Sequence, residues 1–160
     1  MTETPHWLSA EEQRQWRSFI RLHLKLRATL TRDLQTHSEL SGADFEILVA
    51  LTDVPDGRLR ITELAKAVDW EQSRLSHQIS RMIRRALVAR EECAEDGRGV
   101  LVTLTPAGRA AIEAAAPHHV AAVRRYVVDV LSPEELATLG SICRRILDHL
   151  EDAPGSARAG

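Results

Sequence analysis

Residues 61 to 88 carry two short runs of apolar residues at helical spacing, with a break between them. The first run consists of Ile61, Leu64, Ala65 and Val68, and the second of Leu75, Ile79, Met82 and Ile83. Residues three and four apart share one face of an α-helix, so each run predicts a helix with one buried face. Asp69-Trp70 interrupts the spacing, and two short helices joined by so few residues form a helix-turn-helix. We expect the two helices over Thr62–Val68 and Gln72–Arg85.

A β-hairpin is predicted directly after the second helix. Val100 to Leu104 is rich in β-branched and apolar residues, and Val88 to Cys93 can supply its partner strand. The segment Asp96-Gly97-Arg98-Gly99 between them supplies a tight turn with a single basic side chain. Residues 43–104 therefore form a compact middle part, in the order helix, helix, helix, hairpin.

Longer helices are predicted on both sides of this middle part. Ser9 with Glu12, and Ser132 with Glu135, have the spacing of a capping box, and Pro133 fits the first helical position. The predicted helices outside the helix-turn-helix are Ser9–Thr36, Ala43–Leu51, Pro106 toward Leu131 with a kink at Pro117, and Pro133–Leu150. The fold class is mostly α, and the 160 residues fit one domain.

The flanking segments, residues 6–40 and 105–151, are apolar on more than one face. Their large apolar residues include Trp16, Phe19, Ile20, Leu22, Leu24, Leu26 and Leu30 early, and Val123, Val127, Leu139, Ile142, Ile146 and Leu147 late. A helix that is apolar over so wide an arc needs more than one partner surface. Two-fold dimers are the commonest solution, so we expect dimerisation helices in a homodimer. We expect the tail, residues 152–160, to be disordered.

The segment from Ser73 to Arg90 contains five arginines and no acidic residue, although the whole chain has a formal net charge of −2. Opposite its apolar residues, the second helix carries Arg74, Ser76, His77, Gln78, Ser80, Arg81 and Arg84. In the major groove of DNA, arginine binds guanine, glutamine reads adenine and serine binds phosphate. Because a carboxylate here would face the phosphate backbone, the missing acids favour double-stranded DNA as the partner.

The hairpin turn predicts a second contact with DNA. Arg98 at its tip can enter the minor groove, where a narrow A·T tract deepens the negative potential. Asp96 can hold the Arg98 guanidinium in position. The first strand is acidic, so only the tip of the hairpin is expected to approach DNA.

These segments resemble the MarR (multiple antibiotic resistance regulator) family of transcription factors. The matching residues are LAKAVDWEQSRLSHQISRMIRRALV, followed by AREECAEDGRGVLVTLTPAGRAAIEAA. The resemblance implies a winged helix-turn-helix with a two-stranded β wing, in a homodimer that binds a pseudo-palindromic operator and commonly represses transcription. It also implies release of DNA by a small aromatic or phenolic effector, or in some members by cysteine oxidation. The implied DNA-binding residues are Ser73, Arg74, Ser76, His77, Gln78, Arg81 and Arg84 on the recognition helix and Arg98 on the wing, with Asp96 as wing support.

Two residues depart from the family's pattern. Ala86 stands where the family usually has glycine, which serves a left-handed helix end. A residue with a Cβ enters that conformation at a cost of roughly 1 kcal/mol or more, so the helix is expected to end differently. Ile83 stands where a charged residue is common, which suggests an extra contact with another helix.

Two other functions remain open from the sequence alone. A winged-helix protein–protein adaptor that has lost DNA binding would keep the fold but show no steep salt dependence of DNA binding. A ligand-binding or detoxifying protein would use a cleft without any operator; Trp16, His23 and Trp70 can line such a cleft, although they also suit plain packing. The acid-free segment counts against both alternatives.

No enzyme or metal site is predicted. The chain has no phosphate-binding glycine-rich loop, no Gly-x-Ser-x-Gly motif and no paired carboxylates, and we expect no cofactor. His118 and His119 point about 100° apart on a helix and rarely share one ion without other ligands. Cys93 and Cys143 lack CxxC spacing, which fits a reducing cytoplasm and gives no sign of a redox role. With no signal peptide and no apolar run that could cross a bilayer, we expect a cytoplasmic protein.

Overall fold

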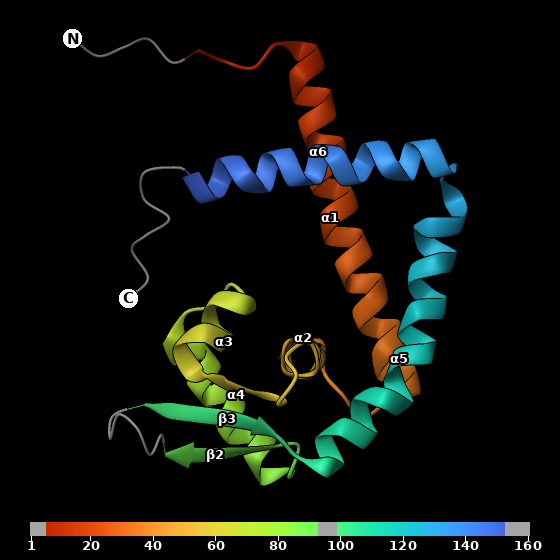
Figure 1. The fold of residues 1–160 in the computed structure, drawn as a ribbon. Coiled ribbons are helices and arrows are strands. Elements are labelled where there is room, and N and C mark those ends of the chain that lie inside the picture. The colour runs from red at the N-terminus through yellow and green to blue at the C-terminus, as the bar shows by residue number, and fades with distance from the viewer. Residues whose placement is uncertain (1–5, 93–98, 153–160) are drawn as a thin grey trace, which may run out of the picture.

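The computed structural model describes residues 6–92 and 99–152 (Figure 1). The elements are α1 (Ala10–His37), α2 (Gly42–Thr52), β1 (Arg58–Arg60), α3 (Ile61–Ala67), α4 (Gln72–Arg84), β2 (Val88–Glu92), β3 (Val100–Leu104), α5 (Pro106–Tyr126), the 3-10 helix η1 (Val128–Val130) and α6 (Pro133–Asp152). The predicted class, mostly α with a winged helix-turn-helix and flanking helices, is confirmed.

The helix starts follow the predicted capping boxes. The backbone N–H of Ser9 donates to Glu12 over 2.7 Å, and that of Ser132 donates to Glu135 over 2.8 Å. Each serine hydroxyl accepts from the glutamate's backbone N–H over 3.2 Å. These bonds satisfy donors that the first helical turn leaves open.

Helix α5 ends earlier than predicted. Val127 leaves the helical conformation with φ −132° and ψ −63°, and η1 replaces the expected last turns. Arg124 donates to Asp129 over 2.5 Å and ties the end of α5 to η1. The helix includes Pro117, as predicted, and its ribbon changes direction along its length (Figure 1).

The sheet has one strand more than predicted. The expected pair β2–β3 is antiparallel with Val88 opposite Leu104, and β1 pairs with the other edge of β3, with Arg58 opposite Thr103. Strand β1 has only three residues, which is too short to show a period-two pattern. Gly57 directly precedes it with φ 61°, and its carbonyl accepts from the Leu104 backbone N–H over 2.8 Å.

The hydrophobic core lies between the helix-turn-helix, α2 and the sheet. Its fully buried side chains are Ile47, Leu48, Leu51, Leu64, Leu75, Ile79, Met82, Val88 and Val102. Helix α5 joins the core edge through Gly108, where a Cβ would lie only 2.0 Å from the Leu87 carbonyl oxygen. Glycine is therefore required at this close approach.

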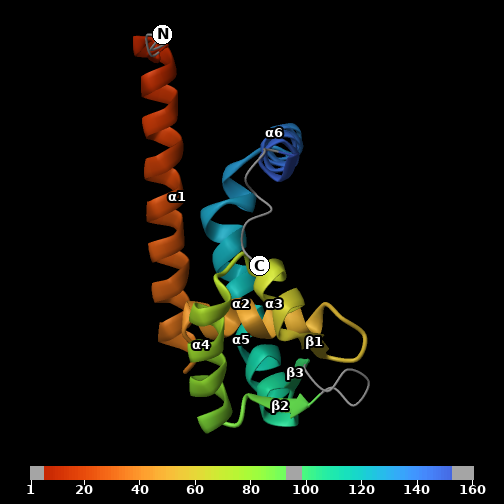
Figure 2. The same cartoon turned by 90° about the vertical axis from the view of Figure 1, so that its left-hand side faces the viewer.

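Helix α6 and the first half of α1 stand outside this core. None of the residues of α6 is buried. The two helices cross in one view but are separate in the other (Figures 1 and 2). The exposed apolar residues on and near them are Trp7, Leu8, Trp16, Phe19, Leu22 and Leu24, then Leu139, Ile142, Ile146, Leu147 and Leu150.

Candidate nucleic-acid interface

Helix α4 has one face in the core and one face in solvent. The buried face consists of Leu75, Ile79 and Met82. At about 100° per residue, the positions pointing most directly away from it are Ser73, His77 and Arg84, all exposed. Exposed Arg74 and Arg81 flank this outer face on one side, and half-buried Ser76 and Ser80 on the other. The outer face thus offers three guanidinium groups, and α4 itself contains no carboxylate.

A left-handed turn at each end fixes α4 in the fold. Before it, Asp69 has φ 53°, and the Trp70 N–H donates to the Ala65 carbonyl over 2.9 Å. After it, Ala86 has φ 56°, and the Leu87 N–H donates to Met82 over 3.0 Å. Both bonds are the six-to-one contact of a Schellman motif.

The expectation that Ala86 would end the helix differently is therefore wrong. Ala86 adopts the left-handed conformation in which the family usually has glycine. The surroundings hold it there: the Thr105 hydroxyl lies 2.6 Å from the Ala86 carbonyl oxygen and 2.9 Å from that of Leu87. Ile83, the other residue that departs from the family's pattern, is partly buried and packs against the core.

A buried carboxylate connects α4 to the start of α2. Asp44 is fully buried and accepts from Gln78 over 2.8 Å and from Arg85 over 2.7 Å. It also accepts from the Ser41 backbone over 2.8 Å, while Arg85 donates to the Glu39 carbonyl over 2.8 Å. A buried charge is tolerated when it is paired and hydrogen-bonded in this way.

Asp44 stays ionised despite its burial. Burial acts to raise the pKa of its carboxyl, but the hydrogen bonds from Arg85 and Ser41 outweigh burial and hold the pKa below its ordinary value. In the sequence, Asp44 stands three residues after Ser41, a spacing that indicates only a helix cap. Its partners lie 34 and 41 residues away along the chain, so no local spacing could reveal them.

The Asp44 contact changes what Gln78 can offer to DNA. An ionised carboxylate only accepts, so the Gln78 amide nitrogen must face Asp44. Bidentate reading of adenine needs both the amide nitrogen and the carbonyl oxygen. In this structure Asp44 takes one of the two N–H donors of Gln78, which leaves the second N–H and the carbonyl oxygen for another partner. Gln78 is thus placed on the α2 side of α4, away from Ser73, His77 and Arg84.

A polar hollow of about 630 Å³ lies beside this contact. Its lining includes Gln35, Ser38 and Glu39 from the end of α1 and its turn, together with Gln78, Arg81 and Arg85 from α4 and its end. Arg81 and Arg85 therefore both line this hollow, beside the outer face of α4.

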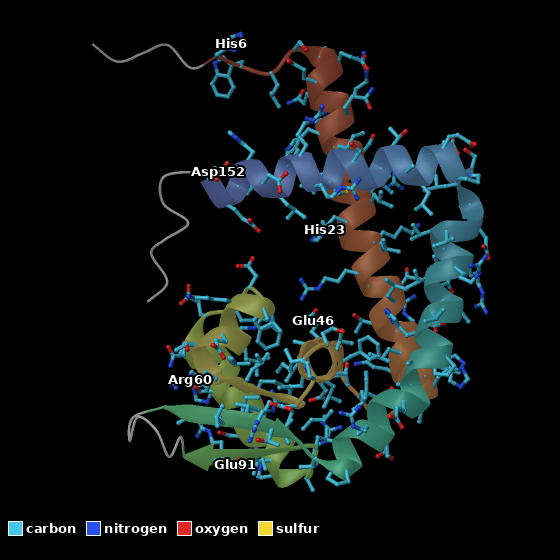
Figure 3. All side chains as sticks on the ribbon, in the orientation of Figure 1. His6, His23, Glu46, Arg60, Glu91 and Asp152 are labelled. Atoms are coloured by element: carbon cyan, nitrogen blue, oxygen red, sulfur yellow. The ribbon has the colours of Figure 1, made fainter. Side chains whose placement is uncertain are left out.

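Trp70, which the sequence left open as a cleft residue or a packing residue, lies two positions before α4 and packs against the core. The guanidinium carbon of Arg74 is 3.9 Å from the centroid of the Trp70 ring. Trp16 lies on α1, where it stacks on Phe19 and lines an open hollow with Arg17, Ile20, Arg21, Leu24 and Lys25. His23 is exposed and projects from α1 (Figure 3). The hollow lined by Trp16 includes neither His23 nor Trp70.

The histidines on α5 contact two different partners. His118 stacks on His37 of α1 with ring centroids 4.7 Å apart, and His119 lies 4.4 Å from the Phe45 ring. Burial lowers the pKa of His119, with Asp33 acting in the opposite direction. Across residues 6–92 and 99–152, no three His, Cys, Asp or Glu side chains form a group that could hold a metal ion.

Three predicted residues cannot be placed. Arg98 and Asp96 of the wing, and Cys93, lie outside the described residues. Cys143 is a free, exposed thiol on α6. No described helix combines the length and apolar character needed to span a bilayer.

The sequence profile of the MarR family matches residues 38–99. The DNA-bound structure of Sco3205, a MarR family transcriptional regulator from Streptomyces coelicolor, is 40% identical to this chain with a TM-score of 0.91. That match covers 99% of this chain and 98% of Sco3205. The chain belongs to the MarR family.

Two more similar proteins are also transcriptional regulators by name. AbsC, a MarR family transcriptional regulator from S. coelicolor, is 41% identical with a TM-score of 0.88, over 93% of this chain and all of AbsC (100%). The HTH-type transcriptional repressor YetL of Bacillus subtilis is 32% identical over 111 residues, which cover 67% of this chain and 66% of YetL. The chain is thus a MarR-family transcriptional regulator and not an enzyme.

Proposed function

We propose that this MarR-family protein is a homodimeric repressor that binds a pseudo-palindromic DNA operator through the outer face of α4. The observation that carries the proposal is the placement of Arg74, Arg81 and Arg84 on the free side of a helix whose other side is fully buried. Guanidinium groups suit both phosphate and guanine. The likeness to Sco3205, which was solved with DNA, supports the same mode of binding.

In this proposal the chain divides its tasks. Residues 43–104 bind DNA, and residues 6–40 and 105–151 form the dimer. Helices α1 and α6 expose many apolar side chains; Trp16, Phe19 and Leu147 each have about half or more of their surface accessible. These side chains support a large interface between copies. Each α4 would serve one half-site, with half-site centres about 10 base pairs apart.

We also propose an effector that releases the DNA. A hollow of about 410 Å³ on α1 combines apolar Leu22 and Leu26 with cationic Arg21 and Lys25, and Tyr126 closes one side. Such a lining suits a small aromatic acid or phenol. The effector acts by binding more tightly to a dimer whose recognition helices are wrongly spaced, because only a difference in affinity can shift that equilibrium.

The DNA-binding proposal is tested on the DNA upstream of the protein's own gene, by fluorescence anisotropy over a salt series. Native protein should bind one site tightly, with a steep loss of affinity as salt rises. Arg74→Ala should relax base selectivity, whereas Arg144→Ala, at an exposed position of α6, should not. If the native protein and both variants bind DNA weakly and without sequence preference, the proposal is contradicted and the adaptor function is favoured.

A further inference from the structure

The pair formed by Trp70 and Arg74 joins the turn of the helix-turn-helix to its reading helix. The guanidinium carbon of Arg74 lies over the indole, 3.9 Å from the ring centroid. The two residues are four positions apart, at the beginning of α4. A cation over an aromatic face at this distance is attracted by the ring's quadrupole.

Trp70 is itself held firmly. Its backbone N–H donates to the Ala65 carbonyl over 2.9 Å, and Asp69 before it takes the left-handed conformation that closes the end of α3. The half-buried indole packs against the hydrophobic core. The ring is therefore a fixed surface and not a mobile side chain that follows Arg74.

Arg74 has no competing partner in the part of the chain that the structure describes. Its guanidinium makes no ion pair there, and its one recorded contact is with Trp70. Among residues 6–92 and 99–152, no aromatic ring lies under the guanidinium of exposed Arg81 or Arg84. Within that part of the chain, Arg74 is thus the one outward-facing arginine of α4 that an aromatic ring holds.

Stacking leaves the hydrogen-bonding edge of the arginine open. The N–H donors of a guanidinium lie in its plane, whereas the indole occupies one face of that plane. Guanine presents O6 and N7 side by side in the major groove and is read by two in-plane N–H donors. A guanidinium held by its face is therefore already prepared to read guanine with its edge, and an unrestrained arginine must be ordered on binding.

We propose that Trp70 is a positioning residue that sets the base selectivity of the protein by holding Arg74 for a guanine contact. The proposal rests on the proposed function, since it requires α4 to lie in the major groove. It assigns Trp70 to DNA recognition and not to an effector cleft.

The test begins with the native protein and a set of operators in which each base pair is changed in turn. Anisotropy should reveal one G·C pair per half-site whose replacement weakens native binding but not binding by Arg74→Ala. Trp70→Leu should then lower the discrimination at that pair by about two- to fivefold, the range of an exposed cation–π contact. Discrimination at other pairs, and the slope of log affinity against log salt, should stay as in the native protein.

Fluorinated tryptophan separates positioning from packing, because it weakens the ring's attraction for a cation and keeps its shape. In a Trp7→Phe/Trp16→Phe background, Trp70 is the only tryptophan of the chain that remains. Discrimination at the guanine should fall stepwise as fluorine atoms are added, and thermal unfolding should not change. In the Arg74→Ala background, fluorination should have no effect.

Two results would overturn the assignment of Trp70 alone. Either discrimination survives both Trp70→Leu and fluorination, or both changes weaken binding equally at every base pair. If the native protein selects no base pair at all, the proposed DNA-reading function fails together with this assignment. If the native protein binds selectively but the changes at Trp70 do not alter that selectivity, only the assignment of Trp70 fails and the proposed regulator function is unaffected.

Discussion

Asp44 ties α4 to the start of α2 through Gln78 and Arg85. Asp44→Ala removes the acceptor shared by Gln78 and Arg85, and should lower the free energy of unfolding by about 2 to 4 kcal/mol. We place the effect below that of a fully buried ion pair because the Arg85 side chain is 42% exposed. Urea denaturation measures the change. Glu46→Ala, at an exposed position of the same helix, should shift stability by no more than about 0.5 kcal/mol.

The lowered pKa of His119 predicts that the folded protein loses stability in mild acid. Burial lowers its pKa in the folded protein, so the fold favours the neutral ring. As the pH falls below the unfolded value of about 6.5, the unfolded chain takes up a proton before the folded protein does, and stability decreases until the folded pKa is passed. His119→Leu should flatten this part of a stability–pH profile measured by urea denaturation between pH 7 and 5. His149→Gln, on exposed α6, is the matched control; an equal slope in His119→Leu would contradict the assignment.

The end of α4 offers a stabilising change. Ala86 holds φ 56° with a Cβ, and glycine removes the steric cost of that conformation. Ala86→Gly should raise the free energy of unfolding by about 0.5 to 1 kcal/mol, once the greater freedom of glycine in the unfolded chain is subtracted. Asp69→Gly should gain less, because aspartate tolerates the left-handed region better. A destabilised Ala86→Gly variant would show that the Ala86 methyl group makes a contact that outweighs its strain.

Elements with strong local signals could be predicted from the sequence. Capping boxes placed the beginnings of α1 and α6 within one residue, and apolar spacing identified the buried face of α4. Strand β1 was missed because pairing with β3, and not its own pattern, makes it a strand. The end of α5 was placed too late because the apolar Val127–Val130 segment is compatible with a helix that the backbone leaves at Val127.

The site was predictable only in part, because its arrangement depends on distant segments. The periodicity of α4 identified His77 and Arg84 as outward-facing without any tertiary information, whereas Ser73 was implied only by the family resemblance. The orientation of Gln78 depends on Asp44, and the sequence left Trp70 open between a cleft and plain packing because its contact with Arg74 is visible only in the structure. A helix pattern defines a face; which side chains on that face are already engaged is decided by the whole molecule.

The exposed apolar surface of α6 predicts how the molecule assembles. Leu139, Ile142 and Ile146 share one face of this helix, and all are exposed in the single chain. Burying such a side chain contributes about 1.5 to 3 kcal/mol, and a two-fold dimer contains each position twice. Ile146→Glu should therefore raise the dimer dissociation constant by at least about 100-fold in analytical ultracentrifugation, and operator affinity should fall with it. Ser141→Glu adds the same charge on the opposite face of α6 and should leave the dimer intact. An unchanged dimer in Ile146→Glu would move the interface away from this face, and the half-site spacing expected for the operator would have to be revised with it.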